Sequence, residues 1–126
     1  MDIVDNAGMS AVHIAAMSGS LDILEFFKEK HLNLMSVDNN GNYPAHLSAS
    51  TGRSDLLEFF FKNGTNINIR NNKQEMLLHI SSRYGQENTV NLLLSKDIEI
   101  NSVDISKNTP LHSAVMGMHK DIALDL

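Results

Sequence analysis

The stretch HIAAMSG, His13 to Gly19, returns as HLSASTG at His46 to Gly52 and as HISSRYG at His79 to Gly85, and a fourth histidine, His112, opens HSAVMGM. Each histidine lies 33 residues after the one before it. Repetition with a period of about 20 to 50 residues is typical of proteins that stack one small structural unit many times. This period therefore indicates the fold class before any single helix or strand is assigned.

The composition limits what these units can build. The chain has 126 residues, of which 42% are hydrophobic and 20% charged, with a formal net charge of -5 and no cysteine. These values fit one globular domain and exclude disulfides and thiolate metal sites. The negative charge argues against nonspecific binding to nucleic acid or anionic lipid. The chain has no membrane-length apolar run and no secretory pattern at its start, so we expect an intracellular protein, cytoplasmic or nuclear.

Each unit contains two short apolar segments with helical spacing. The first segment runs from about Ser10 to Ser18, and in later units Pro44 and Pro110 fall just inside its start, where a missing N–H costs nothing. Glycines then end this segment as left-handed C-caps, namely Gly19, Gly52 and Gly85. The second segment reads LDILEFFKEK in the first unit and SDLLEFFFKN in the second. Asn-rich connectors such as NGTNINIRNNKQ indicate extended β-hairpin loops.

Two helices of about ten residues cannot bury their apolar faces alone, so the units are expected to stack on one another. We predict a single all-α domain over residues 1–126, a solenoid of helix-turn-helix units joined by β-hairpin loops. Small residues on the first helices and bulky residues on the second would curve the stack. The units span approximately residues 5–37, 38–70, 71–103 and an incomplete 104–126, and residues 1–4 form the end of an upstream unit or an N-terminal cap.

These units resemble the ankyrin repeat, whose pattern is D-x-x-G-x-T-P-L-H-x-A-A-x-x-G, then a second helix with I-V-x-x-L-L, then G-A-D-V-N. Residues 109–112 read T-P-L-H, and the earlier units keep the histidine within SAVH, YPAH and MLLH. The match spans nearly the whole chain, and its four phased copies make it specific. The resemblance is strained where Tyr43 and Met76 replace the threonine whose hydroxyl bonds the repeat's own histidine. Only Ser10 and Thr109 keep a hydroxyl there, so we expect the second and third repeats to be looser at this point.

The phased histidines invite a catalytic or metal-binding interpretation, which their spacing opposes. Equivalent positions on stacked helices lie about 8–10 Å apart, whereas each ligand of a zinc ion lies about 2 Å from the metal. We therefore expect a structural role, in which each ring bridges backbone and hydroxyl groups of neighbouring turns. This role falls to His13, His46, His79 and His112. His31 and His119 stand outside the pattern and are expected to be exposed.

Motifs of catalysis are absent from the sequence. It has no G-x-S-x-G elbow, no Walker-type glycine loop, no H-E-x-x-H and no cysteine to pair with a histidine. We therefore predict no enzymatic activity, no cofactor and no metal. The phenylalanines at 26–27 and 59–61 could line a ligand pocket, but their helical spacing favours a core between repeats.

Without motifs of catalysis, the feature that could carry a function is a rigid concave face with variable side chains, which indicates a protein-binding module. The resemblance implies contacts from the hairpin tips and from the exposed end of the first helix. By position, the contact residues are Met17, Asn39, Asn40, Asn42, Arg70, Asn72, Lys73, Glu75, Arg83, Tyr84 and Met116. We expect Arg70, Lys73 and Arg83 to make the concave centre mildly basic. Arg83 and Tyr84 are the predicted hot spots, and the partner is predicted to be a protein segment with acidic and apolar groups.

Two other functions stay open at this point. The chain could be the ankyrin segment of a larger enzyme, channel or regulatory protein, in which the repeats position or gate another part. A receptor for a small ligand or an oligonucleotide is less favoured, because three basic groups and one tyrosine make a thin nucleic-acid site.

Overall fold

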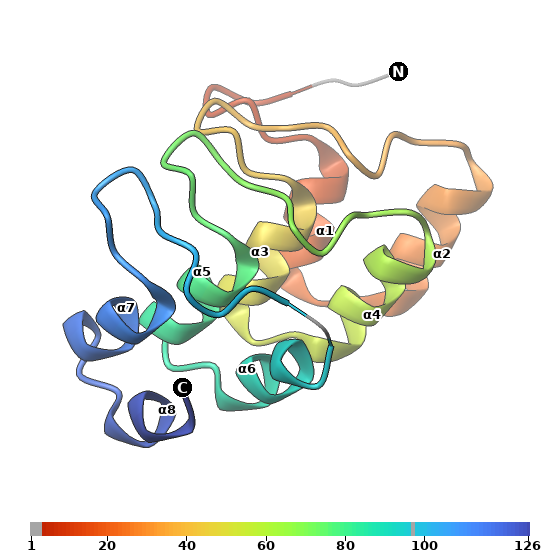
Figure 1. Ribbon diagram of the computed structural model, residues 1–126. Helices are drawn as coiled ribbons and strands as arrows, with labels where there is room; N and C mark the ends of the chain where they lie inside the picture. Colours follow the sequence, from red (N-terminus) through yellow and green to blue (C-terminus); the bar gives the residue numbers. More distant parts are fainter. Residues whose placement is uncertain (1–3, 97) are drawn as a thin grey trace.

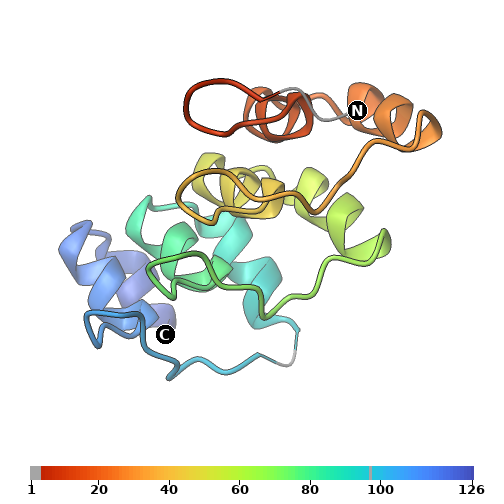
Figure 2. The same cartoon turned by 90° about the horizontal axis from the view of Figure 1, so that it is seen from above.

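The computed structural model describes residues 4–96 and 98–126, and within these ranges the chain forms eight helices and no strand. The helices are α1 (Ala11–Ser18), α2 (Leu21–Glu29), α3 (Pro44–Thr51), α4 (Ser54–Lys62), α5 (Leu77–Arg83), α6 (Glu87–Leu94), α7 (Pro110–Met116) and α8 (Lys120–Asp125). They form four pairs along the chain, which Figure 1 labels and Figure 2 shows following one another along a stack. The predicted all-α solenoid of two-helix units is therefore confirmed.

One helix pair falls within each 33-residue interval of the sequence. Residues 1–3, which the sequence analysis assigns to an upstream unit or a cap, lie outside the described residues. No helix in the described part of the chain has the length and apolar character needed to cross a membrane.

Local signals set the ends of the first helix in each pair. The Ser10 hydroxyl accepts the N–H of His13 at the start of α1, and Thr109 does the same for His112 in α7. Gly19 follows α1 with φ of 79°, a left-handed conformation that glycine adopts without steric cost. Gly52 and Gly85 have the same conformation at equivalent positions, with φ of 74° and 72°.

One side chain folds the tip of each loop between repeats. Asp38 Oδ1 accepts the backbone N–H of Asn40 and of Asn42, both at 2.9 Å. The residues that make this pair of bonds in their own loops are Asp5, Asp38, Asn71 and Asp104. The loops therefore turn back on themselves as expected. A backbone bond also closes each loop, for example from the Asp38 N–H to the Asn42 carbonyl at 3.0 Å, although none of the described residues is assigned to a β-strand.

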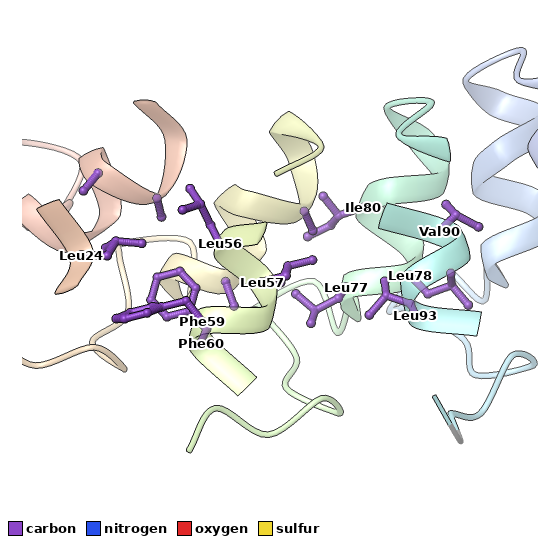
Figure 3. Close-up of a cluster of buried hydrophobic side chains, with 14 of the residues drawn as sticks. Leu24, Leu56, Leu57, Phe59, Phe60, Leu77, Leu78, Ile80, Val90 and Leu93 are labelled. Atoms are coloured by element: carbon purple, nitrogen blue, oxygen red, sulfur yellow. The ribbon is translucent and has the colours of Figure 1, made fainter. Parts of the chain in front are cut away.

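The hydrophobic core lies between successive repeats. Leu57, Phe60 and Leu93 are fully buried, and Figure 3 shows such side chains filling the space from one helix pair to the next. Phe59 and Phe60 pack edge to face with their centroids 5.5 Å apart. First helices contribute small residues such as Ala49, so they pack against one another more closely than the second helices do. This difference gives the stack its wedge shape.

Three buried histidines join consecutive repeats. Each Nε2 lies within hydrogen-bond distance of a carbonyl oxygen in the next loop, from His13 to Asn42, from His46 to Glu75 and from His79 to Asn108, at 2.8, 3.2 and 2.8 Å. Each Nδ1 accepts the backbone N–H of the residue three positions earlier, at 3.0 to 3.1 Å. A ring nitrogen that accepts an N–H carries no proton, so the proton is on Nε2 and the ring is neutral. Each ring thereby ties the start of its own helix to the following repeat.

The resemblance to ankyrin repeats assigns a hydroxyl that bonds the histidine of the same repeat, but the backbone bonds of the histidines form without it. Ser10 and Thr109 place their hydroxyls 2.9 and 2.8 Å from Nδ1 of their own histidines. In the second and third repeats, which lack this hydroxyl, His46 and His79 are nevertheless buried and keep both of their backbone bonds. The expected looseness at these two positions is therefore not seen in their hydrogen bonding.

We predict that His79→Ala lowers the free energy of unfolding by about 1–3 kcal/mol, because it leaves the buried Met76 N–H and the Asn108 carbonyl without their partner. Urea denaturation followed by circular dichroism measures the loss. His112→Ala is the matched control, since this exposed ring bonds only its own repeat. Equal effects of the two substitutions would contradict the joining role.

The neutral rings also predict a pH dependence of stability. Burial lowers the pKa of His46 to about 4, although the Glu75 carbonyl that accepts its bond opposes the shift. A histidine in the unfolded chain has a pKa of about 6.5. Between that pH and about 4, the His46 ring therefore binds a proton in the unfolded chain but stays neutral in the folded chain. The free energy of unfolding should therefore fall as the pH drops from about 6.5 to about 4, by about 3 kcal/mol for His46 alone. Urea denaturation across this range should show a flatter profile for His46→Gln, and an unchanged slope would count against this account.

Candidate partner-binding groove

The second and third repeats enclose a groove of about 420 Å³ between their first helices and the loops that precede them. It brings together seven of the residues proposed for partner binding, namely Asn40, Asn42, Asn72, Lys73, Glu75, Arg83 and Tyr84. Leu47 and Ile80 add an apolar wall that the sequence analysis did not assign to binding. The groove is therefore the place where the predicted contact residues gather most densely.

A buried carboxylate organises the floor of this groove. The Glu75 side chain forms an ion pair with Arg83, and its Oε1 accepts the amide of Asn71 at 2.9 Å. The same amide lies 2.9 Å from Oδ1 of Asn42 in the preceding loop. The sequence predicted that Glu75 contacts a partner directly, but its side chain is only 3% exposed. Glu75 instead connects Arg83 and Asn71 beneath the groove.

The Glu75–Arg83 pair changes the charge expected at the concave centre. Burial alone would raise the pKa of Glu75, but hydrogen bonds from Arg83 and Asn71 outweigh it and hold the pKa below its usual value. Burial opposes the charge of Arg83 too, yet Glu75 raises the pKa of its guanidinium. Both groups therefore stay ionised and cancel one another. The positive charge of the groove rests with the exposed Lys73.

Tyr84 stands at the rim of the groove with its ring half exposed. The guanidinium carbon of Arg83 lies 5.1 Å from the centroid of this ring, a distance that suits a cation–π contact. Because Glu75 fixes Arg83 from the other side, the guanidinium gives the ring a stationary neighbour. The Arg83 guanidinium thus connects the buried Glu75 carboxylate to the Tyr84 ring at the rim of the groove.

Other proposed contact residues lie outside this groove. Arg70 lines a separate hollow with Asn68 and Ile98, and its Nη1 donates to the carbonyls of Gln74 and Val103 at 2.8 and 3.0 Å. It therefore ties the third and fourth loops together and does not join Lys73 and Arg83 at a basic centre.

Met17 and Met116 occupy the positions on α1 and α7 that Arg83 occupies on α5, and both are exposed. The amide of Asn39 donates to the carbonyl of Asn6 at 3.0 Å, and that of Asn72 donates to Asn39 at 3.3 Å. The two asparagines thus connect the loop tips.

A set of backward bonds between repeats escaped the sequence analysis. Side chains that follow the end of a first helix reach the end of the preceding repeat's first helix, from Arg53 to Gly19, from Gln86 to Ser50 and from His119 to Arg83, each at 2.9 Å. His119 is half-buried by this contact and not exposed as expected, whereas His31 is exposed. The shared signal is a polar residue at each of positions 53, 86 and 119, 33 residues apart.

The four phased histidines do not form a metal centre in this arrangement. Within residues 4–96 and 98–126, no three His, Asp or Glu side chains are grouped in a way that could hold a metal ion. The nitrogen atoms of His13, His46 and His79 are engaged with backbone groups, as described above.

Comparison with known proteins places this architecture in a family. The family described as ankyrin repeats (3 copies) matches residues 1–71 and again residues 56–126, so the two matches together cover the chain. No curated protein matches the chain. The 33-residue period, the stacked helix pairs and the family match agree, and the chain belongs to the ankyrin repeat family.

Proposed function

We propose that the chain is a non-catalytic protein–protein interaction module that binds a partner protein through its concave groove and the neighbouring hairpin tips. Ankyrin repeats are generally protein-binding modules and are typically without catalytic activity. The observation that carries the proposal is the Arg83–Tyr84 pair, which the buried Glu75 orients at the rim of the groove. Arginine and aromatic side chains in such fixed positions contribute most to binding energy in protein interfaces.

The groove favours a partner segment that carries both acidic and apolar groups. Lys73 has no carboxylate of the described residues within 4.0 Å, so its ammonium is available to an acidic side chain. Leu47, Ile80 and the Tyr84 ring offer apolar surface beside it. A segment with an acidic residue next to an aliphatic or aromatic one would satisfy both parts of the groove.

The same groove would serve a free-standing adaptor or the ankyrin segment of a larger enzyme, channel or regulatory protein. The proposal places the protein inside the cell, in the cytoplasm or the nucleus. Proteins of these compartments rarely contain disulfides, which agrees with a chain that has no cysteine. It requires no cofactor and no nucleic acid.

We predict that Tyr84→Ala and Lys73→Glu each weaken partner binding by more than about tenfold, because one removes the aromatic rim and the other reverses the available charge. Partners captured by the unmodified chain are identified by mass spectrometry, and their affinities for each variant are then measured by calorimetry. Asn91→Ala, at an exposed position on α6, is the matched control and should bind like the unmodified chain. Partners that bind all these variants equally would refute the groove as the binding site.

Charge reversal at Arg83 makes a poor test of the same idea. Arg83→Glu would place a second carboxylate beside the buried Glu75, which should cost on the order of 3 kcal/mol of stability. Loss of binding in that variant would mix unfolding with loss of contact. Tyr84 and Lys73 are better positions, since neither side chain is buried.

A further inference from the structure

The loop tip of the third repeat departs from the two tips before it. At the turn of the first two loops stand Gly8 and Gly41, with φ of 78° and 76°. The third loop has Gln74 at this position, in the same left-handed conformation, with φ of 61°. A side chain strains this conformation, because its Cβ comes too close to the following carbonyl oxygen, and glycine avoids the strain. The third loop therefore carries a strained residue where glycine would fit without strain.

A bond between loops explains why the earlier tips have glycine. The amide of Asn72 donates to the Asn39 carbonyl, and a Cβ on Gly41 would clash with the side chain and the backbone nitrogen of Asn72. Asn39 reaches back to the first loop and stands against Gly8 in the same way. Glycine and asparagine thus form a pair across each of these two junctions.

The junction between the third and fourth loops has neither member of this pair. Ile105 occupies the position of Asn39 and Asn72, so it has no amide to reach back to the third loop. The backbone bond of the tips remains, from the Ile105 N–H to the Lys73 carbonyl at 2.8 Å. The side-chain connection between loop tips is therefore lost at this junction.

An arginine provides another connection between the two loops. Nη1 of Arg70 donates to the carbonyls of Gln74 and Val103 at 2.8 and 3.0 Å. The other repeats have valine at the position of Arg70, namely Val4, Val37 and Val103. Both bonds of Arg70 end on backbone carbonyls, so they hold the strained loop without using the Gln74 side chain.

The side chains at this tip are exposed. Lys73 and Gln74 are exposed, and Ile105 is 66% exposed. The position of Ile105 is also exposed inside the stack, at Asn39 and Asn72, so the exposure is a property of the loop tips. Backbone strain that glycine would remove, at a residue with an exposed side chain, favours a role in recognition.

We propose that Lys73, Gln74 and Ile105 form a loop-tip patch that continues the groove and binds the same linear segment of the partner, an inference that rests on the proposed function. One apolar side chain of the segment would lie against Leu47 and Tyr84 in the groove. An acidic side chain would reach Lys73, and a second apolar side chain would cover Ile105. The main chain would pass Gln74, whose amide group can both donate to a carbonyl and accept from an N–H. The partner segment thus has an acidic residue between two apolar ones.

The charges around the patch favour an acidic residue at this place. Two carboxylates of the third and fourth loops are already engaged, since Glu75 is paired with Arg83 and Asp104 Oδ1 accepts backbone N–H groups of its own loop. Lys73 forms none of the ion pairs within the described residues. A carboxylate of the partner would therefore meet an available ammonium.

Selection of a phage-displayed library of random linear peptides on the 126-residue chain tests the inference without knowledge of the natural partner. Enriched peptides should carry an acidic residue between two apolar ones. A synthetic copy of one such peptide, added to the isotope-labelled chain, should shift the backbone amide signals of Gln74, Ile105 and Tyr84 in NMR spectra. A library that yields no binder, or binders without an acidic residue, would overturn the inference.

Two substitutions measure the contribution of the patch. Calorimetry with the synthetic peptide should show binding weakened by about tenfold for Gln74→Gly and for Ile105→Ser. Val37→Ser is the matched control, because it removes a valine that is 50% exposed and lies outside the patch, and it should bind like the unmodified chain.

Two further readouts separate recognition from folding and the patch from the groove. The melting temperature of Gln74→Gly should be no lower than that of the unmodified chain, because glycine removes the strain. A lower melting temperature would assign Gln74 a structural role and overturn the inference. Binding that is lost in Tyr84→Ala but unchanged in Gln74→Gly and Ile105→Ser would overturn the loop-tip patch and leave the proposed groove in place.

Discussion

The requirement that a buried imidazole stay neutral holds the stack together. Each ring must accept a backbone N–H through Nδ1 and donate through Nε2 to the next loop, and a charged ring cannot do both. In the second repeat this bond ends on the carbonyl of Glu75, and so it fixes the residue whose carboxylate anchors Arg83. The position of the Tyr84 ring therefore depends on a histidine in the preceding repeat. The scaffold and the groove are parts of one connected chain of contacts.

The bonds between repeats run in both directions and differ in how strictly they specify a residue. Forward bonds come from histidine each time, because one ring has to serve as donor and acceptor at two fixed distances. Backward bonds come from Arg53, Gln86 and His119, since any side chain that carries an N–H to the carbonyl is sufficient there. A sequence search for identical residues finds the first set and misses the second. Only the shared polarity at a 33-residue spacing reveals it.

The 33-residue period predicted the helices and the stack, because two short helices cannot bury their apolar faces alone and must pack against the next repeat. It also predicted the turns of the loops, in which Asp5, Asp38, Asn71 and Asp104 accept backbone N–H groups of their own loops. The burial of Glu75 could not be read from the sequence, because it depends on Arg83 reaching back eight residues to it. Arg70 was misplaced for a related reason, since its long side chain turns toward the backbone of the next loop.

Asn71 stands where the other three loops have aspartate, and its amide donates a hydrogen bond to the Glu75 carboxylate that an aspartate could not offer. An aspartate at this place would set two negative groups side by side beneath the groove. The amide and the glutamate consequently form a unit that has to be changed as a pair. A protein engineer who varied position 75 to change specificity and kept Asn71 would therefore obtain mostly variants in which this hydrogen bond beneath the groove is lost.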